Sequence, residues 1–259
     1  MTFVQTQEGK DKVEGEYLVN REITVIITMA GMGSRFRKAG YDCPKYMIEA
    51  KGKTLFEWSM DSLLGYREHI SKYIFVTRSG DHGTAFIKRY CDKYGFLNIH
   101  IIELEETTDG QATTCMLAIP ACDPDKAILV YNIDTYVEPY ELKYENISGD
   151  GHIPCFNAPG THWSFVKLNE YGKVIEVREK ERISDNCTLG AYYFSSANLY
   201  KKLYEEFYLL NKRDSGEKYI APLYNLMIEK NMEVTINMVD SDKVHVLGTP
   251  EELKRFLDK

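Results

Sequence analysis

The chain has 259 residues, of which 44% are hydrophobic and 27% are charged, and its formal net charge is −7. This composition is ordinary for one large α/β domain or two small ones, and the negative charge argues against a broad nucleic-acid-binding surface. No apolar stretch approaches the ~20 residues of a membrane span, the polar N-terminus shows no signal peptide, and the six scattered cysteines form no Cys-x-x-Cys pair. We therefore expect a cytoplasmic protein with reduced thiols, without a zinc site or a disulfide framework.

Predicted strands and helices alternate through the first half of the chain. Residues 1–21 are predicted to form a loosely packed extension, and the apolar run at 23–29 predicts a buried strand. Further strands are predicted at 73–77, 98–104 and 127–131, and helices at 54–64, 81–94 and 113–119. This alternation indicates βαβ units and a mostly parallel sheet.

After Pro139 the pattern becomes richer in turns and β-segments. Strands are predicted at 162–168, 174–178, 189–194, 234–239 and 243–246, and helices at 199–210, 221–229 and 250–257. No internal repeat or low-complexity linker interrupts the chain. We therefore expect one domain over residues 22–259, with an N-terminal half (22–139) and a C-terminal half (140–259).

The loop after the first predicted strand carries the strongest functional signal. Its residues run Ala30, Gly31, Met32, Gly33, Ser34 and Arg35, with Pro44 and Lys45 following nine and ten residues after the arginine. A glycine turn that leads from a strand into a helix presents backbone N–H groups to an anion, and Arg35 and Lys45 add two positive charges. Phe36 stands where a dinucleotide fingerprint needs a third glycine, and the Gly-Lys-Ser/Thr of a P-loop is missing. The loop therefore favours a nucleoside triphosphate.

Gly-x-Gly-x-Arg followed by Pro-Lys resembles the signature loop of the nucleotidyltransferases that join a nucleoside triphosphate to a phosphorylated acceptor. Glucose-1-phosphate thymidylyltransferases and small phosphosugar or phosphocholine-type cytidylyltransferases belong to this family. The resemblance implies an α/β fold, a Rossmann-like (GT-A-like) three-layer αβα sandwich with a mostly parallel mixed central sheet. It also implies that Arg35 holds the β- and γ-phosphates and that Lys45 bridges the α-phosphate and the incoming phosphate. One departure is Tyr46, which replaces the second proline of the family's Pro-Lys-Pro.

Asp134 follows a predicted strand, where ligands bind in open α/β sheets. It resembles the family's metal aspartate and is expected to hold Mg²⁺. The family usually supplies a second metal aspartate two residues before a Gly-Thr-Pro turn, but this chain has Val246 before its turn at 248–250. Valine cannot bind a metal. Three alternatives stay open: Asp134 acts with water and phosphates alone, Asp240 or Asp242 reaches the site, or the chemistry differs.

Residues 107–112 lie between a predicted strand and a predicted helix and resemble the loop that receives the nucleobase in this family. Gly110 would let the backbone approach the base closely, and Gln111 offers both a donor and an acceptor. Glu105 stands where some thymidylyltransferases carry a base-reading glutamine. Because a carboxylate only accepts hydrogen bonds, Glu105 would favour an exocyclic amine such as that of cytosine.

Glu179 and Lys180 precede Gly190 in an arrangement that resembles the family's Glu-Lys-Pro and Gly-x-Tyr-x-Phe segments. The resemblance implies that Glu179 holds a sugar hydroxyl and that Lys180 holds the acceptor phosphate. A cation suits that position because a dianionic phosphate must approach another anion. Glu181 replaces the family's proline, and Asn157, after a β-like stretch, is a further acceptor-side candidate.

The expected activity is nucleotidyl transfer (EC 2.7.7) from CTP, UTP or dTTP to a phosphorylated small molecule, with a sugar 1-phosphate as the first choice. The product would be a precursor for a capsule, a lipopolysaccharide or another surface glycan. Three alternatives stay open: cytidylyl transfer to a non-sugar phosphate, a GT-A-fold glycosyltransferase, and a non-catalytic nucleotide sensor. The residues at 132–134 match only half of a glycosyltransferase Asp-x-Asp motif. Neither nucleic acid nor membrane is an expected partner, and a homo-oligomeric state stays open.

Overall fold

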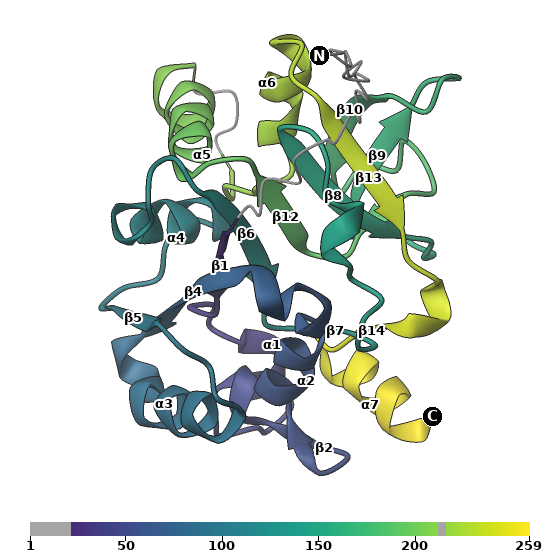
Figure 1. The fold of residues 1–259 in the computed structure, drawn as a ribbon. Coiled ribbons are helices and arrows are strands. Elements are labelled where there is room, and N and C mark those ends of the chain that lie inside the picture. The colour runs from purple at the N-terminus through teal and green to yellow at the C-terminus, as the bar shows by residue number, and fades with distance from the viewer. Residues whose placement is uncertain (1–21, 212–215) are drawn as a thin grey trace, which may run out of the picture.

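The computed structural model describes residues 22–211 and 216–259, so the extension predicted at 1–21 lies outside the described residues. Within them, a ten-stranded sheet has the order β10-β9-β11-β8-β12-β6-β1-β4-β5, and β13 pairs with β8 (Figure 1). Two small sheets, β7–β14 and β2–β3, accompany it. None of the helices in these residues combines the length and apolar character that a bilayer span requires.

The N-terminal half supplies the parallel part of the large sheet. Its paired strands are β1 (Ile23–Thr28), β4 (Ile70–Arg78), β5 (Ile99–Leu104) and β6 (Ala127–Asn132). Its helices are α1 (Ser34–Lys38), α2 (Leu55–Asp61), α3 (Gly83–Tyr94) and α4 (Gln111–Ala118). The strands predicted at 23–29, 73–77, 98–104 and 127–131 all form. The short strands β2 (Glu49–Ala50), β3 (Lys53–Thr54) and β7 (Thr135–Val137) were not predicted, because two or three residues are too few to show a strand period.

The C-terminal half extends the same sheet with mostly antiparallel strands. These are β8 (Gly151–Phe156), β9 (Ser164–Leu168), β10 (Val174–Glu179), β11 (Cys187–Thr188), β12 (Ala191–Phe194), β13 (Val234–Met238) and, in its own small sheet, β14 (Val244–Val246). Its helices are α5 (Ala197–Tyr204), α6 (Leu223–Glu229) and α7 (Pro250–Asp258). The helix expected to reach residue 210 continues beyond α5 as a π-helical turn, Glu205–Leu210. The central sheet is therefore mixed, as expected, but parallel pairing predominates only in the N-terminal half.

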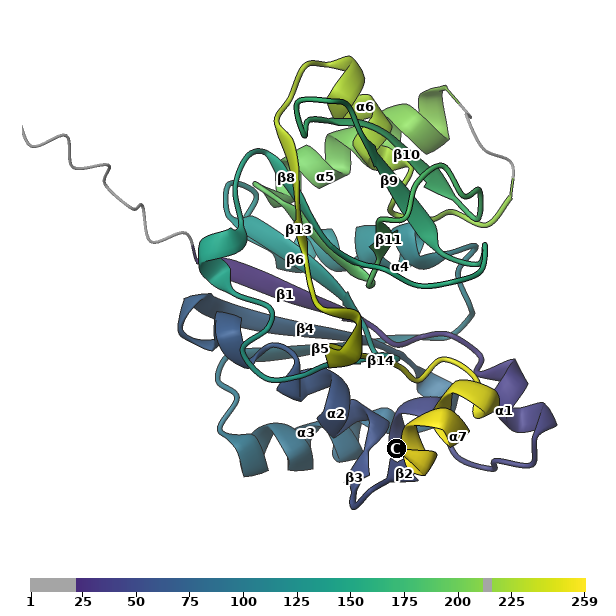
Figure 2. The ribbon, with the colours of Figure 1, turned by 90° about the vertical axis from the view of Figure 1, so that its right-hand side faces the viewer.

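Helices cover both faces of the sheet and produce three layers, because side chains along a strand alternate between the two faces. On β1, Ile26 belongs to the core under α4, α5 and α6, whereas Val25 and Ile27 belong to the core under α2 and α3. Figure 2 shows α2 and α3 below the sheet and α5 and α6 above it. This arrangement buries the central strands on both faces and explains the continuous apolar run of β1.

A third, smaller core fixes the C-terminal helix to the loop that follows β1. Phe36 of α1 and Leu55 of α2 pack in one cluster with Tyr136 of β7 and with Leu253 and Phe256 of α7. Figure 2 shows α7 beside α1. Residues more than 200 positions apart in the sequence are thereby brought to the same end of the sheet.

Candidate active site

A cavity of about 620 Å³ opens at the carboxyl ends of β1 and β6, whose last residues Thr28 and Asn132 lie in register. Both halves of the chain line it. The expected site residues that reach it are Ala30, Gly31, Met32, Arg35, Lys45, Gly110, Gln111, Asp134, Glu179, Lys180 and Gly190. The carboxyl edge of parallel strands is the usual ligand site of an open α/β sheet.

The loop after β1 brings two cations to the cavity wall. Gly33 adopts a left-handed backbone (φ 59°) at the start of α1, which a side chain would strain, and neither Gly33 nor Ser34 lines the cavity. Arg35 is exposed on α1, and Lys45 begins a 3₁₀ turn over Lys45–Met47. Both side chains line the cavity.

Tyr46, which departs from the family pattern, lines the cavity and joins this loop to β4. Its ring is 2% exposed, and its hydroxyl lies 3.2 Å from Thr77 Oγ1 on β4. Burial raises the pKa of the Tyr46 phenol to about 12, so the group stays neutral. The substitution therefore replaces a rigid proline with a buried hydrogen-bonded anchor directly beside Lys45.

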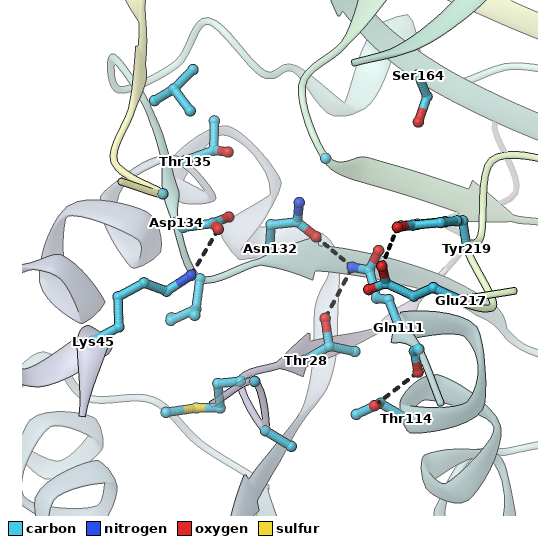
Figure 3. A pocket seen from close by; sticks show the side chains of 18 of the residues that line it. Thr28, Lys45, Gln111, Thr114, Asn132, Asp134, Thr135, Ser164, Glu217 and Tyr219 are labelled. Carbon is cyan, nitrogen blue, oxygen red and sulfur yellow. Dashed lines mark hydrogen bonds and ion pairs between the residues drawn. The ribbon is translucent and has the colours of Figure 1, made fainter. Parts of the chain in front are cut away.

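Lys45 and Asp134 form an ion pair in the wall of the cavity, with Nζ 2.7 Å from Oδ2 (Figure 3). Asp134 lies between β6 and β7, and β14 pairs with β7 so that Val246 stands opposite Thr135. Val246 therefore lies beside Asp134, as the family spacing implied, and it lines the cavity. Of the two proposed replacements, Asp240 and Asp242 are both exposed and neither lines the cavity.

Glu252 is a lining residue that the sequence argument missed. It lies in the first turn of α7, whose position next to the cavity depends on the β7–β14 pairing and on the third core. In the sequence, Glu252 belongs to a Thr-x-x-Glu pattern at 249–252. This pattern predicts the start of a helix but does not indicate whether the glutamate lines a cavity.

Gln111 joins the ends of β1 and β6. Its Nε2 donates to Thr28 Oγ1 at 3.0 Å and also to Asn132 Oδ1 (Figure 3). Gly110 precedes it with φ 153°, and a β-carbon at Gly110 would lie 2.3 Å from the carbonyl oxygen of Lys218. The close backbone approach expected at Gly110 therefore exists, but in this structure the approaching group is the backbone at Lys218.

The C-terminal half contributes Glu179 and Lys180 from the end of β10. Ser164 Oγ donates to the Glu179 carboxylate, and burial raises the pKa of that carboxyl group. Lys180 has a left-handed backbone (φ 57°), and its Nζ donates to Tyr219 Oη and lies 3.9 Å from Glu217 Oε2. Sequence reasoning missed Tyr219 and Glu217 because they are almost 40 residues away from Lys180 and carry no motif.

Gly190 connects the two halves at the β6–β12 pairing. Its backbone is left-handed (φ 87°), and a β-carbon there would lie 2.4 Å from Asn132 Nδ2. Two expected site residues lie elsewhere: Glu105 is exposed and accepts a hydrogen bond from Ser79, and Asn157 is exposed after β8. Since neither lines the cavity, we leave both out of the proposed site.

No protein-family model matches the chain. A solved structure does: the nucleoside-diphosphate-sugar pyrophosphorylase from Vibrio cholerae RC9 is 36% identical, with a TM-score of 0.83, and the match covers 91% of this chain and 100% of that one. The chain belongs to the sugar-phosphate nucleotidyltransferase family. Coverage of 91% of this chain shows that the likeness extends far beyond the loop.

More distant nucleotidyltransferases share the fold. The inositol-1-phosphate CTP transferase from T. maritima is 16% identical with a TM-score of 0.74, and the match covers 92% of this chain and 94% of that one. A Bacillus anthracis protein assigned as a glucose-1-phosphate thymidylyltransferase is 16% identical with a TM-score of 0.75, covering 91% and 94%. At this identity the likeness shows the fold alone.

A curated relative matches only a short segment. It is assigned as a UDP-N-acetylglucosamine pyrophosphorylase from Encephalitozoon cuniculi (strain GB-M1) and is 43% identical over 65 residues. The match spans 25% of this chain and 18% of the relative.

The oxygen ligands in the cavity fit a magnesium ion. Within residues 22–211 and 216–259, no three His, Cys, Asp or Glu side chains gather as a metal cluster. Mg²⁺ does not require such a cluster, because it keeps several waters and binds one or two carboxylates together with substrate phosphates. Asp134 and Glu252 line the cavity and are carboxylates of the required kind.

Proposed function

We propose that this nucleotidyltransferase transfers a nucleotidyl group from a nucleoside triphosphate to a phosphorylated small molecule, with a sugar 1-phosphate as the first choice of acceptor. The observation that carries the proposal is the set of charges that line one cavity. Arg35, the Lys45–Asp134 ion pair and Lys180 all lie in its wall. Three cations in one cavity suit two phosphates that must approach each other.

In the proposed reaction, an oxygen of the acceptor phosphate attacks the α-phosphorus of the nucleoside triphosphate. The new P–O bond forms as the bond from the α-phosphorus to the bridging oxygen breaks, and pyrophosphate leaves with that electron pair. The acceptor phosphate is already ionised, so no general base is required. Catalysis then depends on positioning and on neutralisation of charge.

Each cation has a separate part in this proposal. Arg35 holds the β- and γ-phosphates, and Lys45 exchanges its contact with Asp134 for one with the α-phosphate and the incoming phosphate. Lys180 fixes the acceptor phosphate. Mg²⁺, held by Asp134, would supply additional positive charge at the α-phosphate.

The acceptor side suits a hydroxyl-rich molecule. Glu179 accepts a hydrogen bond from Ser164 and retains capacity for another, which a sugar hydroxyl could donate. Trp163 also lines this side of the cavity and offers a flat apolar face. On this basis we propose a sugar 1-phosphate acceptor, CTP, UTP or dTTP as donor, and a product that serves as a precursor of surface polysaccharide.

The test is release of pyrophosphate from each of the four ribonucleoside triphosphates and dTTP, with a panel of sugar 1-phosphates and with phosphocholine, a phosphopolyol and a phosphoamino acid. We expect release only when an acceptor is present, and loss of release in Lys45→Ala but not in Lys38→Ala, which removes an exposed lysine outside the cavity. Release with a non-sugar phosphate alone would reassign the acceptor. Transfer from a nucleotide sugar, or binding without turnover, would overturn the proposal.

A further inference from the structure

We propose that Glu252, from the first turn of α7, serves as the second metal-binding carboxylate of this chain, in place of the aspartate that is absent at Val246. The inference rests on the proposed function, because it concerns the ion that would accompany the nucleotide. It assigns to this chain a ligand at a sequence position different from the one that the family spacing indicates.

The geometry around Gly248 brings the two carboxylates together. A β-carbon on Gly248 would lie 3.1 Å from Asp134 Oδ2 and 3.4 Å from Glu252 Oε2, so both carboxylates converge on this glycine. The backbone fixes the approach, because Leu247 N donates to the Asp134 carbonyl at 2.8 Å and Val246 pairs with Thr135. Glycine keeps the space between the two carboxylates open.

The hydrogen bonds at the start of α7 leave the Glu252 carboxylate directed to the cavity. At α2, a full capping box forms: Thr54 Oγ1 accepts from Glu57 N, and the Glu57 carboxylate accepts from Thr54 N at 2.8 Å. At α7, Thr249 Oγ1 accepts from Glu252 N at 3.2 Å, but within the described residues the return bond to the Glu252 carboxylate does not form. The same sequence pattern therefore serves a helix cap at α2 and leaves a carboxylate for the cavity at α7.

The charges around the two carboxylates also favour a cation there. Asp134 is paired with Lys45 at 2.7 Å, whereas no lysine or arginine among residues 22–211 and 216–259 lies within ion-pair distance of Glu252. One negative charge therefore remains at this point of the cavity wall. The bond from Lys45 reaches Asp134 Oδ2, so Asp134 Oδ1 can join the Glu252 carboxylate on one hard cation before a phosphate binds.

The test measures binding of Mn²⁺ alone to the full chain, in the wild type and in Glu252→Gln. The EPR signal of free Mn²⁺ reports how much of the ion is bound. We expect the Kd for Mn²⁺ to rise about tenfold or more, by analogy with the loss that follows weakening of a metal site, and a similar rise in Asp134→Asn. The matched control is Glu251→Gln, because Glu251 occupies the same first turn of α7 but is exposed and outside the cavity. Thermal melting of each variant verifies that it is folded.

A rescue variant separates metal binding from a structural part in the helix. Val246→Asp combined with Glu252→Gln should restore the Kd for Mn²⁺ toward the wild-type value, because it returns a carboxylate to the family position. A double variant as weak as Glu252→Gln would overturn the inference. So would an unchanged Kd in Glu252→Gln, an equal loss in Glu251→Gln, or a wild-type chain that binds no Mn²⁺.

The outcomes distinguish this inference from the proposed function. If acceptor-dependent release of pyrophosphate occurs while Mn²⁺ binding is insensitive to Glu252, only the inference fails. If Mn²⁺ binds through Glu252 but no acceptor yields pyrophosphate, only the proposed function fails.

Discussion

In the N-terminal half, the cavity residues follow parallel strands, whereas in the C-terminal half they come from several antiparallel strands, from the first turn of α7 and from the segment before α6. Thr28 and Asn132 lie opposite each other because β1 and β6 are parallel and in register. Lys180 follows β10, while its partner Tyr219 precedes α6. The first arrangement depends on sheet geometry alone and the second on packing between remote segments.

Local sequence is therefore sufficient to place cavity residues only where the strands are parallel. Consecutive parallel strands all end at the same edge, so a motif placed after each strand falls into the same site. Antiparallel strands end at alternate edges, so which turn faces the cavity depends on the complete strand order. The predictions below test whether the two halves make separable contributions.

The largest expected effect is in the N-terminal half. Lys45→Ala should lower kcat by about 10²–10³-fold, because it removes a positive charge from the point at which the transition-state charge develops. Binding of the triphosphate, measured by isothermal titration, should weaken far less. Lys38→Ala provides the matched control. Equal kcat values for Lys45→Ala and the wild type would remove Lys45 from the mechanism.

Gly110→Ala tests the contact between the halves and should affect stability. The added β-carbon would lie 2.3 Å from Lys218 O. Alanine would also have to adopt φ 153°, a value that residues with side chains rarely take. We expect a loss of about 2–4 kcal/mol in the free energy of unfolding, measured with denaturant, from strain and overpacking. Gly80→Ala has open space around it and should change stability by less than about 0.5 kcal/mol. Similar free energies of unfolding for the two variants would show that the backbone at Lys218 can shift at little cost.

Lys180→Met should raise the KM for the acceptor by about 10- to 100-fold, as expected for loss of one hydrogen bond to a charged group. It should leave the Kd for the triphosphate unchanged, because the proposed function assigns Lys180 to the acceptor phosphate and Arg35 to the triphosphate. Lys173→Met, at an exposed position outside the cavity, is the control. A rise in the Kd for the triphosphate equal to the rise in acceptor KM would contradict a division of the site between the two halves.

The smallest expected effect is a pH dependence of stability in the C-terminal half. Burial lowers the pKa of His152, whose Nε2 lies 2.8 Å from Asn237 Oδ1 across the β8–β13 pair. The unfolded chain binds a proton at His152 more readily than the folded chain does. The free energy of unfolding should therefore fall as the pH drops below the ordinary histidine pKa of about 6.5. His152→Gln should reduce this slope, and His82→Gln, at an exposed position, should retain it. Identical slopes in all three chains would assign the effect to other groups.

In the N-terminal half, the cavity residues that could be predicted follow predicted strands, whereas most of the other lining residues carry no sequence signal. Arg35, Lys45 and Asp134 were found from the loop pattern and from apolar runs that predicted β1 and β6. Glu105 is expected in the site because it stands where some thymidylyltransferases carry a base-reading glutamine, but its side chain is exposed and accepts a hydrogen bond from Ser79. The end of a strand fixes only the approximate position of the residues that follow it. Neighbouring side chains there can point in different directions, so one of them can lie outside the site.

The pattern of the loop at 30–45, the alternation of strands and helices and the departure at Val246 were all visible in the sequence, because each depends on neighbours within about a dozen residues. Only the tertiary structure decided that Glu252 lies beside Asp134, that Lys180 contacts Tyr219, and that the backbone at Lys218 occupies the space beside Gly110. The physical reason is that these contacts depend on the pairing of β7 with β14 and on packing across the sheet. Such contacts join segments from about 40 to more than 100 residues apart, and no local pattern encodes them.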